Sequence, residues 1–364
     1  MTLNPSKIGL GTISYFKKNI DKKTELKKRL YSFDFANSLG VNFFDTADSY
    51  ENGDAEKILS KFIYNKRAKI FLATKFSPKF LKFRSIKIAC EKSLKRLKTD
   101  YIDLYQLHWP NPEANFEDQI LSLEKLLKAG KIRYAGISNC TKNQIIIAKK
   151  ILGKRLYSHQ DKLNLLTKPD DFKKGYLDLM KKQHIKNISY GVFGQGFLKF
   201  SPKQKIFLDR ILKKYDMSLS QFIIKWISMY DKNGHILTNS LDKNHIIQNI
   251  KALNKQIYYK DFLKVKNFFK TKVQKINIDK IKVIDWDIDK SHKIYTSLNE
   301  ANLNKYNLKP SIEHLVDEIK INGFKPIELK KGKNNYFVMQ GRMRFWAHKY
   351  LYPQKKMVPS IILF

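Results

Sequence analysis

Four polar side chains, Asp45, Tyr50, Lys75 and His108, follow short apolar runs in the first third of the sequence. Their types could reduce a carbonyl, because a phenol such as Tyr50 can deliver a proton to the oxygen on which a transferred hydride leaves negative charge. The Lys75 cation would lower the pKa of that phenol, and Asp45 would pair with the lysine. His108, as a neutral imidazole, would orient the substrate oxygen. The set therefore predicts a carbonyl-reducing site.

Taken singly, each residue has an ordinary structural explanation. An aspartate after an apolar strand commonly caps the next helix, and a lone histidine is commonly a hydrogen-bonded core residue. The hypothesis depends on the grouping, which needs three neighbouring strands to bring the four side chains together.

The elements that would do so are indicated by β-rich runs alternating with amphipathic helical patterns. The expected strands are Lys7–Tyr15, Val41–Ala47, Ile70–Phe76, Ile102–His108, Ile132–Asn139, Tyr157–Leu163, Asn187–Phe193 and His235–Ser240. Eight such units predict an α/β fold, a (β/α)8 TIM barrel, in which polar residues at the carboxyl ends of the strands meet at one mouth. A doubly wound sheet is disfavoured because no GxGxxG turn follows the first strand.

Three motifs resemble the signatures of the aldo-keto reductase family: Phe44–Tyr50 (FDTADSY), Ala73–Phe76 (ATKF) and Ser93–Pro110 (SLKRLKTDYIDLYQLHWP). The resemblance covers about residues 6–253. It implies hydride transfer between a reduced nicotinamide and an aldehyde, ketone or sugar carbonyl, or the reverse oxidation, with the four residues above as the catalytic set and Tyr50 as the acid. Retention of His108 favours a carbonyl over a carbon–carbon double bond.

The resemblance also implies a set of cofactor contacts, which are Ser138, Asn139, Gln160, Tyr190, Gln195, Asn239, Ser240, His245, Gln248 and Asn249. Tyr190 would stack on the nicotinamide ring. Two cations that relatives place around the adenosine phosphate are replaced here, although Lys243 could substitute for one of them. NADP(H) is kept ahead of NAD(H) on the family precedent, and NAD(H) stays an alternative.

A second domain is expected over residues 276–364, after an aldo-keto reductase domain over 1–275. Its pattern resembles the ParB N-terminal/sulfiredoxin superfamily, a small α+β fold with a phosphate-binding turn. Gly341, Arg342 and Arg344 would form that turn, because helix N-terminal amides and guanidinium groups both favour anions. Arg342 stands where sulfiredoxin has its cysteine, which excludes that redox chemistry. The pattern leaves open whether this domain binds a second nucleotide or anion, or has a packing and docking role.

Composition narrows the function classes. The 364 residues carry a formal charge of +38, but the lysines are spread along the chain, so nucleic-acid binding through the C-terminal domain is only an alternative, as is a non-catalytic, cofactor-sensing regulatory protein. Two cysteines without metal-ligand spacing predict reduced thiols and no metal site. The absence of a long apolar run or a signal-peptide pattern predicts a cytoplasmic protein that does not enter a membrane. The oligomeric state is left open.

Overall fold

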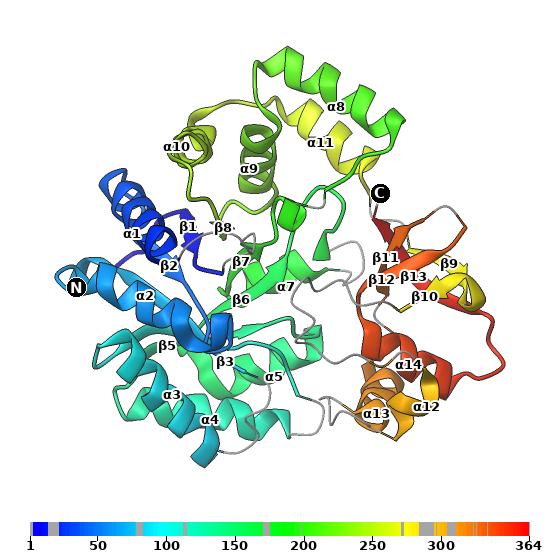
Figure 1. Cartoon of the computed structure of the whole chain (residues 1–364), viewed down its shortest axis with the longest axis horizontal. Coiled ribbons are helices and arrows are strands. Elements are labelled where there is room, and N and C mark those ends of the chain that lie inside the picture. Colours follow the sequence, from blue (N-terminus) through cyan, green and yellow to red (C-terminus); the bar gives the residue numbers. More distant parts are fainter. Residues whose placement is uncertain are drawn as a thin grey trace.

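A computed structural model provides the structure of the chain. It describes residues 3–13, 22–77, 83–111, 115–169, 175–196, 198–270, 273–283, 295, 297–303, 311–322, 324, 326–332 and 334–363. Within these ranges the chain forms two bodies of secondary structure: a closed barrel and a separate five-stranded sheet (Figure 1).

The barrel consists of eight parallel strands that pair in chain order, with β1 closing against β8. Their bounds are β1 Ile8–Gly11, β2 Phe43–Asp45, β3 Phe71–Phe76, β4 Ile102–Leu107, β5 Ile132–Ser138, β6 Leu156–Lys162, β7 Lys186–Tyr190 and β8 His235–Thr238. Each strand begins and ends within two residues of the predicted run, except that β1 ends four residues earlier and β7 three residues earlier. The prediction of a TIM barrel is confirmed.

Helices surround the barrel (Figure 1). They are α1 Lys22–Ser38, α2 Asp54–Ile63, α3 Phe83–Leu97, α4 Phe116–Lys128, α5 Lys142–Leu152, α7 Tyr176–Lys182, α8 Pro202–Tyr215, α9 Leu219–Tyr230, α10 Lys243–Lys251 and α11 Tyr259–Phe268. Capping boxes start α5, α8 and α9, where Thr141, Ser201 and Ser218 each accept from the backbone three residues on. In the part of the chain described, no helix has the length and apolar character needed to cross a membrane.

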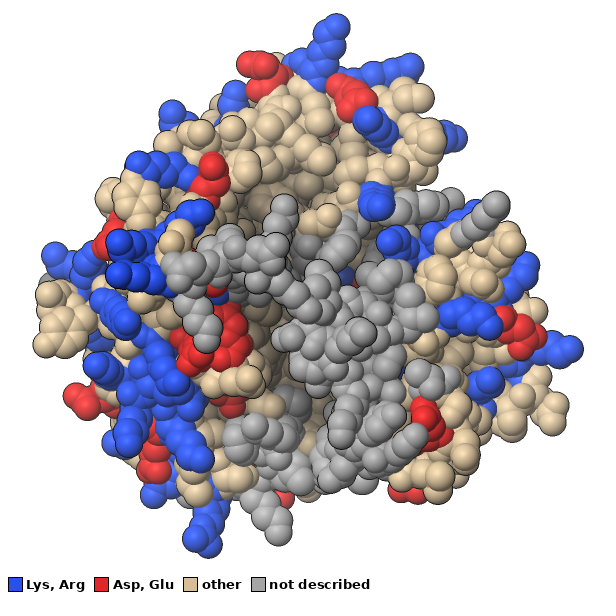
Figure 2. All heavy atoms as spheres, viewed as in Figure 1, with Lys and Arg blue, Asp and Glu red and all other residues tan. Residues whose placement is uncertain are grey.

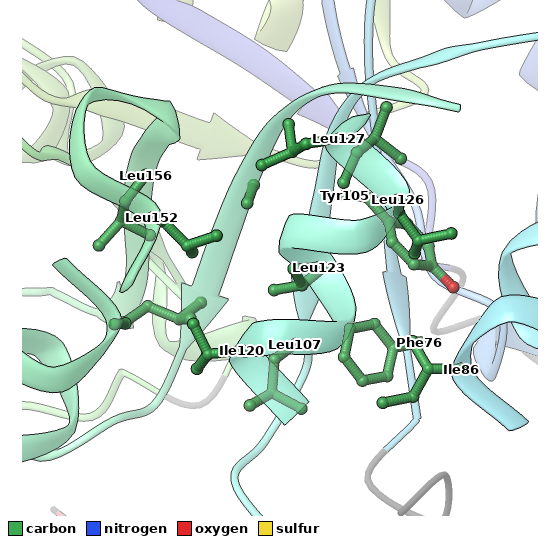
Figure 3. Close-up of a cluster of buried hydrophobic side chains, with 14 of the residues drawn as sticks. Phe76, Ile86, Tyr105, Leu107, Ile120, Leu123, Leu126, Leu127, Leu152 and Leu156 are labelled. Carbon is green, nitrogen blue, oxygen red and sulfur yellow. The ribbon is translucent and has the colours of Figure 1, made fainter. Parts of the chain in front are cut away.

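One large core cluster lies between the outer face of β3 to β6 and helices α3 to α5 (Figure 3). Phe76 and Tyr105 come from the strands, and their rings lie 5.3 Å apart. Leu123 and Leu127 reach the cluster from α4, four residues apart on one helix face. This packing fixes the outer sides of β3 and β4. Lys75 lies on the inner side of β3, and His108 directly follows the carboxyl end of β4.

The second body is a mixed sheet with the strand order β10-β12-β11-β13-β9 and with helices beside it. Its elements are β9 Val273–Asn277, β10 Ile281–Lys282, α12 Leu298–Asn302, α13 Ile312–Asn322, β11 Ile327–Lys331, β12 Tyr336–Gln340, α14 Arg342–Leu351 and β13 Met357–Leu363. We call residues 273–363 the C-terminal module. The expected boundary at 275/276 falls inside β9, because the lysine-rich sequence there carries no turn signal that marks the start of the strand.

Lysine and arginine side chains outnumber acidic ones on the face drawn in Figure 2, over the barrel helices and the C-terminal module alike. The positive charge is therefore distributed around this face of the molecule and does not form a single stripe.

Candidate active site

A buried lysine is the centre of the predicted set. The Lys75 side chain is fully buried at the carboxyl end of β3, and its Nζ lies 2.5 Å from Asp45 Oδ1, which ends β2. The same Nζ donates to the Thr46 carbonyl at 2.8 Å and to Tyr50 Oη at 3.4 Å. Burial by itself would lower the pKa of Lys75, but the charge of Asp45 raises it above its ordinary value. Lys75 is therefore held as a cation.

The second oxygen of Asp45 is also satisfied. Asp45 Oδ2 accepts from Gln160 Nε2 at 3.0 Å and from Gln106 Nε2 at 3.3 Å. These amides come from β6 and β4 and cross the barrel interior to the carboxylate. A carboxylate with this many donors is fixed in place. Gln106 was not predicted as part of the site; its position two residues before His108, on the inward face of a strand, was the available signal.

Tyr50 lies in a short 3-10 segment, Tyr50–Gly53, that leads into α2. Glu51 and Asn52 both adopt left-handed backbone conformations, with φ of 51° and 53°. Such conformations cost energy in residues other than glycine and need support from outside the turn. Arg29 of α1 supplies it, since Arg29 Nη2 lies 2.7 Å from Glu51 Oε1.

Glu56 is a further supporting residue that the sequence did not reveal. It is completely buried in α2, accepts from Thr74 Oγ1 at 2.7 Å and pairs with Arg96 Nε at 2.5 Å. Thr74 directly precedes Lys75. Glu56 thus joins the helix that follows the Tyr50 turn to the strand that carries Lys75.

His108 lies beside Tyr50, with ring centroids 5.6 Å apart in an edge-on arrangement. Burial, and then the charge of Lys75, lowers the pKa of His108 to about 3, so the imidazole is neutral at ordinary pH, as predicted for a hydrogen-bond donor.

The pKa of Tyr50 differs from the expectation. Burial raises it by more than Lys75 lowers it, so the phenol remains fully protonated and Lys75 only offsets part of the burial effect.

These side chains line a cavity of about 530 Å³ at the barrel mouth. Asp45, Tyr50 and His108 are on its wall, and Lys75 lies directly behind them. The cavity continues past the strand ends from β4 to β8, where the remaining wall includes Trp109, Ser138, Asn139, Gln160, Lys162, Tyr190, Gly191, Gly194, Gly196 and Asn239. The structure thus brings the predicted catalytic set together with half of the predicted cofactor contacts.

At the end of β5, Asn139 has a left-handed φ of 61° and links two neighbours. Its amide donates to the His108 carbonyl at 3.1 Å, and its carbonyl oxygen accepts from Tyr190 Oη at 2.8 Å. This contact fixes the Tyr190 ring at the wall of the cavity, where a flat ring could stack on it.

The other predicted cofactor residues lie further out. Ser240 follows β8, while His245, Gln248 and Asn249 are on α10 and are not part of the described cavity wall. Asn249 is buried, His245 is exposed, and Lys243 Nζ lies 4.4 Å from the Tyr31 ring centroid. The side chain of Gln195 lies outside what the structure describes.

In the C-terminal module the predicted glycine turn is present between β12 and α14. Gly341 has φ 92°, and a Cβ there would lie 2.9 Å from both Arg344 Nη2 and Ile327 Cγ2. Arg344 is folded back over the turn and donates to the Pro326 carbonyl at 3.0 Å. Arg342 is the first residue of α14. The anion-binding role of this turn stays a prediction.

The closed barrel with this polar set at its carboxyl ends is the architecture of a barrel oxidoreductase. Residues 7–269 match the Aldo/keto reductase family, and the chain belongs to that family. It is 30% identical over 283 residues to the uncharacterized oxidoreductase YqkF of Bacillus subtilis, covering 69% of this chain and 88% of that one. It is also 28% identical to the glyoxal reductase of Bacillus subtilis, covering 62% and 78% of the two chains.

Solved structures agree on the fold. A thermostable aldo-keto reductase in complex with the inhibitor epalrestat superposes with a TM-score of 0.66 at 25% identity, covering 72% of this chain and 94% of that one. An aldo/keto reductase from Klebsiella pneumoniae in complex with NADP and acetate gives 0.64 at 21% identity, covering 73% and 92%. The matched family region ends at residue 269, before the C-terminal module begins.

Proposed function

We propose that the protein is an NADP(H)-dependent reductase of aldehyde, ketone or sugar carbonyls that uses Asp45, Tyr50, Lys75 and His108. The observation that carries the proposal is the contact of one buried ammonium with both the Asp45 carboxylate and the Tyr50 hydroxyl, next to a neutral His108. As hydride reaches the carbonyl carbon, Tyr50 gives its proton to the oxygen, and Lys75 stabilises the phenolate left behind. His108 donates a hydrogen bond that holds the oxygen beside Tyr50.

The nicotinamide supplies the hydride when it is bound, and the residues present fit such a group. Tyr190 offers a ring fixed by Asn139, while Ser138, Asn139 and Gln160 provide polar atoms at the carboxyl ends of β5 and β6. The loop after β7 adds Gly194 and Gly196, both with positive φ, which bring bare backbone to the wall of the cavity. NADP(H) is favoured over NAD(H) by the family, and relatives from Klebsiella pneumoniae were solved with NADP and NADPH.

Fluorescence titration with NADPH and NADH, followed by an aldehyde, ketone and sugar panel, tests the proposal. Tyr50→Phe should lower kcat by roughly 10²–10⁴-fold, the typical contribution of a general acid, and leave the NADPH Kd unchanged. Tyr105→Phe is the matched control, because Tyr105 is buried in the core, outside the described cavity wall, and its hydroxyl has no hydrogen-bond partner in the described residues. Failure to bind either cofactor would overturn the reductase assignment. Binding without turnover of any carbonyl would favour the regulatory alternative.

A second proposal concerns the C-terminal module, which we propose binds a nucleotide or other phosphate-bearing anion at Gly341, Arg342 and Arg344, as the ParB/sulfiredoxin-like pattern implies. It is supported by the left-handed glycine and the two arginines at the start of α14. Titrating the full chain with ATP and with inorganic phosphate should give binding that Arg342→Gln weakens without changing NADPH affinity. Equal binding by wild type and variant would leave packing against the barrel as the role of the turn.

A further inference from the structure

Among the described residues that line the barrel cavity, Glu328 of β11 comes from outside the barrel. Its Oε2 lies 2.6 Å from Nζ of Lys162, the last residue of β6. The side chains of Glu328 and Lys162 are only 8% and 16% exposed. A carboxylate from the C-terminal module is therefore part of the cavity that holds Tyr50 and His108.

Strand alternation explains how Glu328 reaches the barrel. Its neighbours Ile327 and Leu329 are both fully buried in the core of the module, so Glu328 points from the opposite face of β11. On that face Glu328 is only 6% exposed, and its carboxylate contacts Lys162 of the barrel. The pairing register of β11 with β12 shifts between Glu328 and Leu329, an irregularity of the kind that re-aims a side chain. The barrel mouth therefore covers this residue.

Strand alternation also explains why the Lys162 side chain points into the cavity. It lies two residues after Gln160 on β6, so both side chains belong to the same inward row, with Lys162 nearer the mouth. A Cβ on Gly191 would lie 3.4 Å from Lys162 Cγ, which shows that the lysine stem runs across the bare backbone of Gly191. The ammonium is thus brought to Glu328 across β7, on the side of the barrel opposite β2 and β3.

We propose that Glu328 is a specificity-determining residue of the reductase, through which the C-terminal module selects neutral, hydroxylated carbonyl substrates and rejects anionic ones. This inference rests on the proposed function. The paired carboxylate and ammonium offer an acceptor and a donor side by side, which suits a substrate hydroxyl. A substrate carboxylate would meet the charge of Glu328, and the charge of Lys162 beside it is already neutralised.

Glu328→Gln tests this inference by a gain of activity, which misfolding cannot imitate. Removing the carboxylate releases Lys162, so kcat/KM for succinic semialdehyde should rise roughly ten-fold relative to propanal, while glyceraldehyde falls relative to propanal by a similar factor. Propanal is the internal reference because it carries neither hydroxyl nor charge. The matched control is Asp317→Asn, the same chemical change on an exposed side chain of α13, and it should leave all three ratios unchanged.

The double variant Lys162→Met with Glu328→Gln removes both charges and leaves no unpaired buried ion, so it guards against loss of folding. Measured relative to propanal, it should lose the gain for succinic semialdehyde. Unchanged substrate ratios in Glu328→Gln, with propanal still reduced, would overturn the inference and leave the reductase function standing. A wild-type protein that binds no nicotinamide and reduces no carbonyl would overturn the proposed function, and this inference with it.

Discussion

Lys75 Nζ and Asp45 Oδ1 lie 2.5 Å apart at the ends of two adjacent strands, with 0% and 3% of their side chains exposed. An ion pair removed from water in this way depends on both partners, because the loss of one leaves a buried charge without compensation.

Asp45→Asn should therefore destabilise the fold as well as the site. We expect the free energy of unfolding to fall by about 3–5 kcal/mol, the usual cost of breaking a buried pair, and kcat to fall with it. Urea unfolding at pH 7 measures the first quantity. Asp54→Asn provides the control, since that carboxylate is 62% exposed and its pair with Lys57 contributes little. Equal stabilities for the two variants would contradict the burial argument.

Glu56→Gln should impair catalysis from a position outside the cavity. The amide keeps the shape of the side chain but loses the charge that Arg96 needs and weakens the contact with Thr74, so Tyr50 and Lys75 lose their common support. We expect a loss of about 2–4 kcal/mol in unfolding free energy, somewhat less than for a fully buried pair because Arg96 is 22% exposed, and a lower kcat at unchanged NADPH Kd. Glu91→Gln, in an exposed pair 3.8 Å long, should be neutral in both assays. A drop in NADPH affinity equal to the drop in kcat would point to general disruption and not to positioning.

The barrel and the grouping of the four proposed site residues were predictable because they depend on local, periodic features. The alternation of strand and helix patterns gave the eight units, and motifs around Asp45, Lys75 and His108 lie at strand ends that differ little from those observed. Glu56 was not predictable, because an acidic residue in an amphipathic helix normally faces water, and its burial depends on Arg96 from another helix. Glu328 escaped prediction for a similar reason: its partner lies 166 residues away in the sequence. The direction in which the pKa of Tyr50 shifts could not be predicted, because it depends on how deeply the side chain is buried, which no pattern of residue types reveals.

His108 and His235 should make the protein sensitive to acid. Burial is the largest cause that lowers the pKa of His108 to about 3 and that of His235 to about 4, both below the ordinary value of 6.5. The unfolded chain therefore binds protons at these positions at higher pH than the folded chain does. Stability should be fully present above pH 6.5 and fall as the pH drops, by up to about 1.4 kcal/mol per pH unit for each histidine.

His235→Gln should make this dependence shallower by about one histidine's share, measured as unfolding free energy from pH 7 to pH 4.5. His245→Gln, at an exposed position, should leave the slope unchanged. A slope that is the same in the wild type and His235→Gln would show that His235 is not buried as a neutral ring. Reduction by the folded enzyme should meanwhile show no inflection near pH 6.5, because His108 does not titrate there.

The two cysteines should be unreactive in the native protein. Cys90 and Cys140 are both completely buried, and burial is the main cause that raises the pKa of the Cys90 thiol to about 12. Since the thiolate is the reactive form, alkylation by iodoacetamide at pH 8 should be slow in the native state and complete after unfolding in guanidinium. Mass spectrometry of the alkylated chain gives both extents. Rapid native labelling of Cys90 would contradict its position in the core.

Gly136→Ala should act on the site through Gln106. A Cβ at this position of β5 would lie 2.7 Å from Gln106 Cγ and 2.9 Å from Ser158 Oγ, closer than packed atoms allow, so Gln106 must shift. Because Gln106 Nε2 donates to Asp45 Oδ2, the shift disturbs the carboxylate that holds Lys75. We expect a loss of about 1–3 kcal/mol in stability from overpacking, together with a lower kcat. Gly11→Ala serves as the stability control, since its nearest neighbour would be Thr238 O at an ordinary 3.6 Å. Full activity in Gly136→Ala would mean that Gln106 can move without disturbing Asp45, and that Gln160 and Lys75 are sufficient to fix the carboxylate.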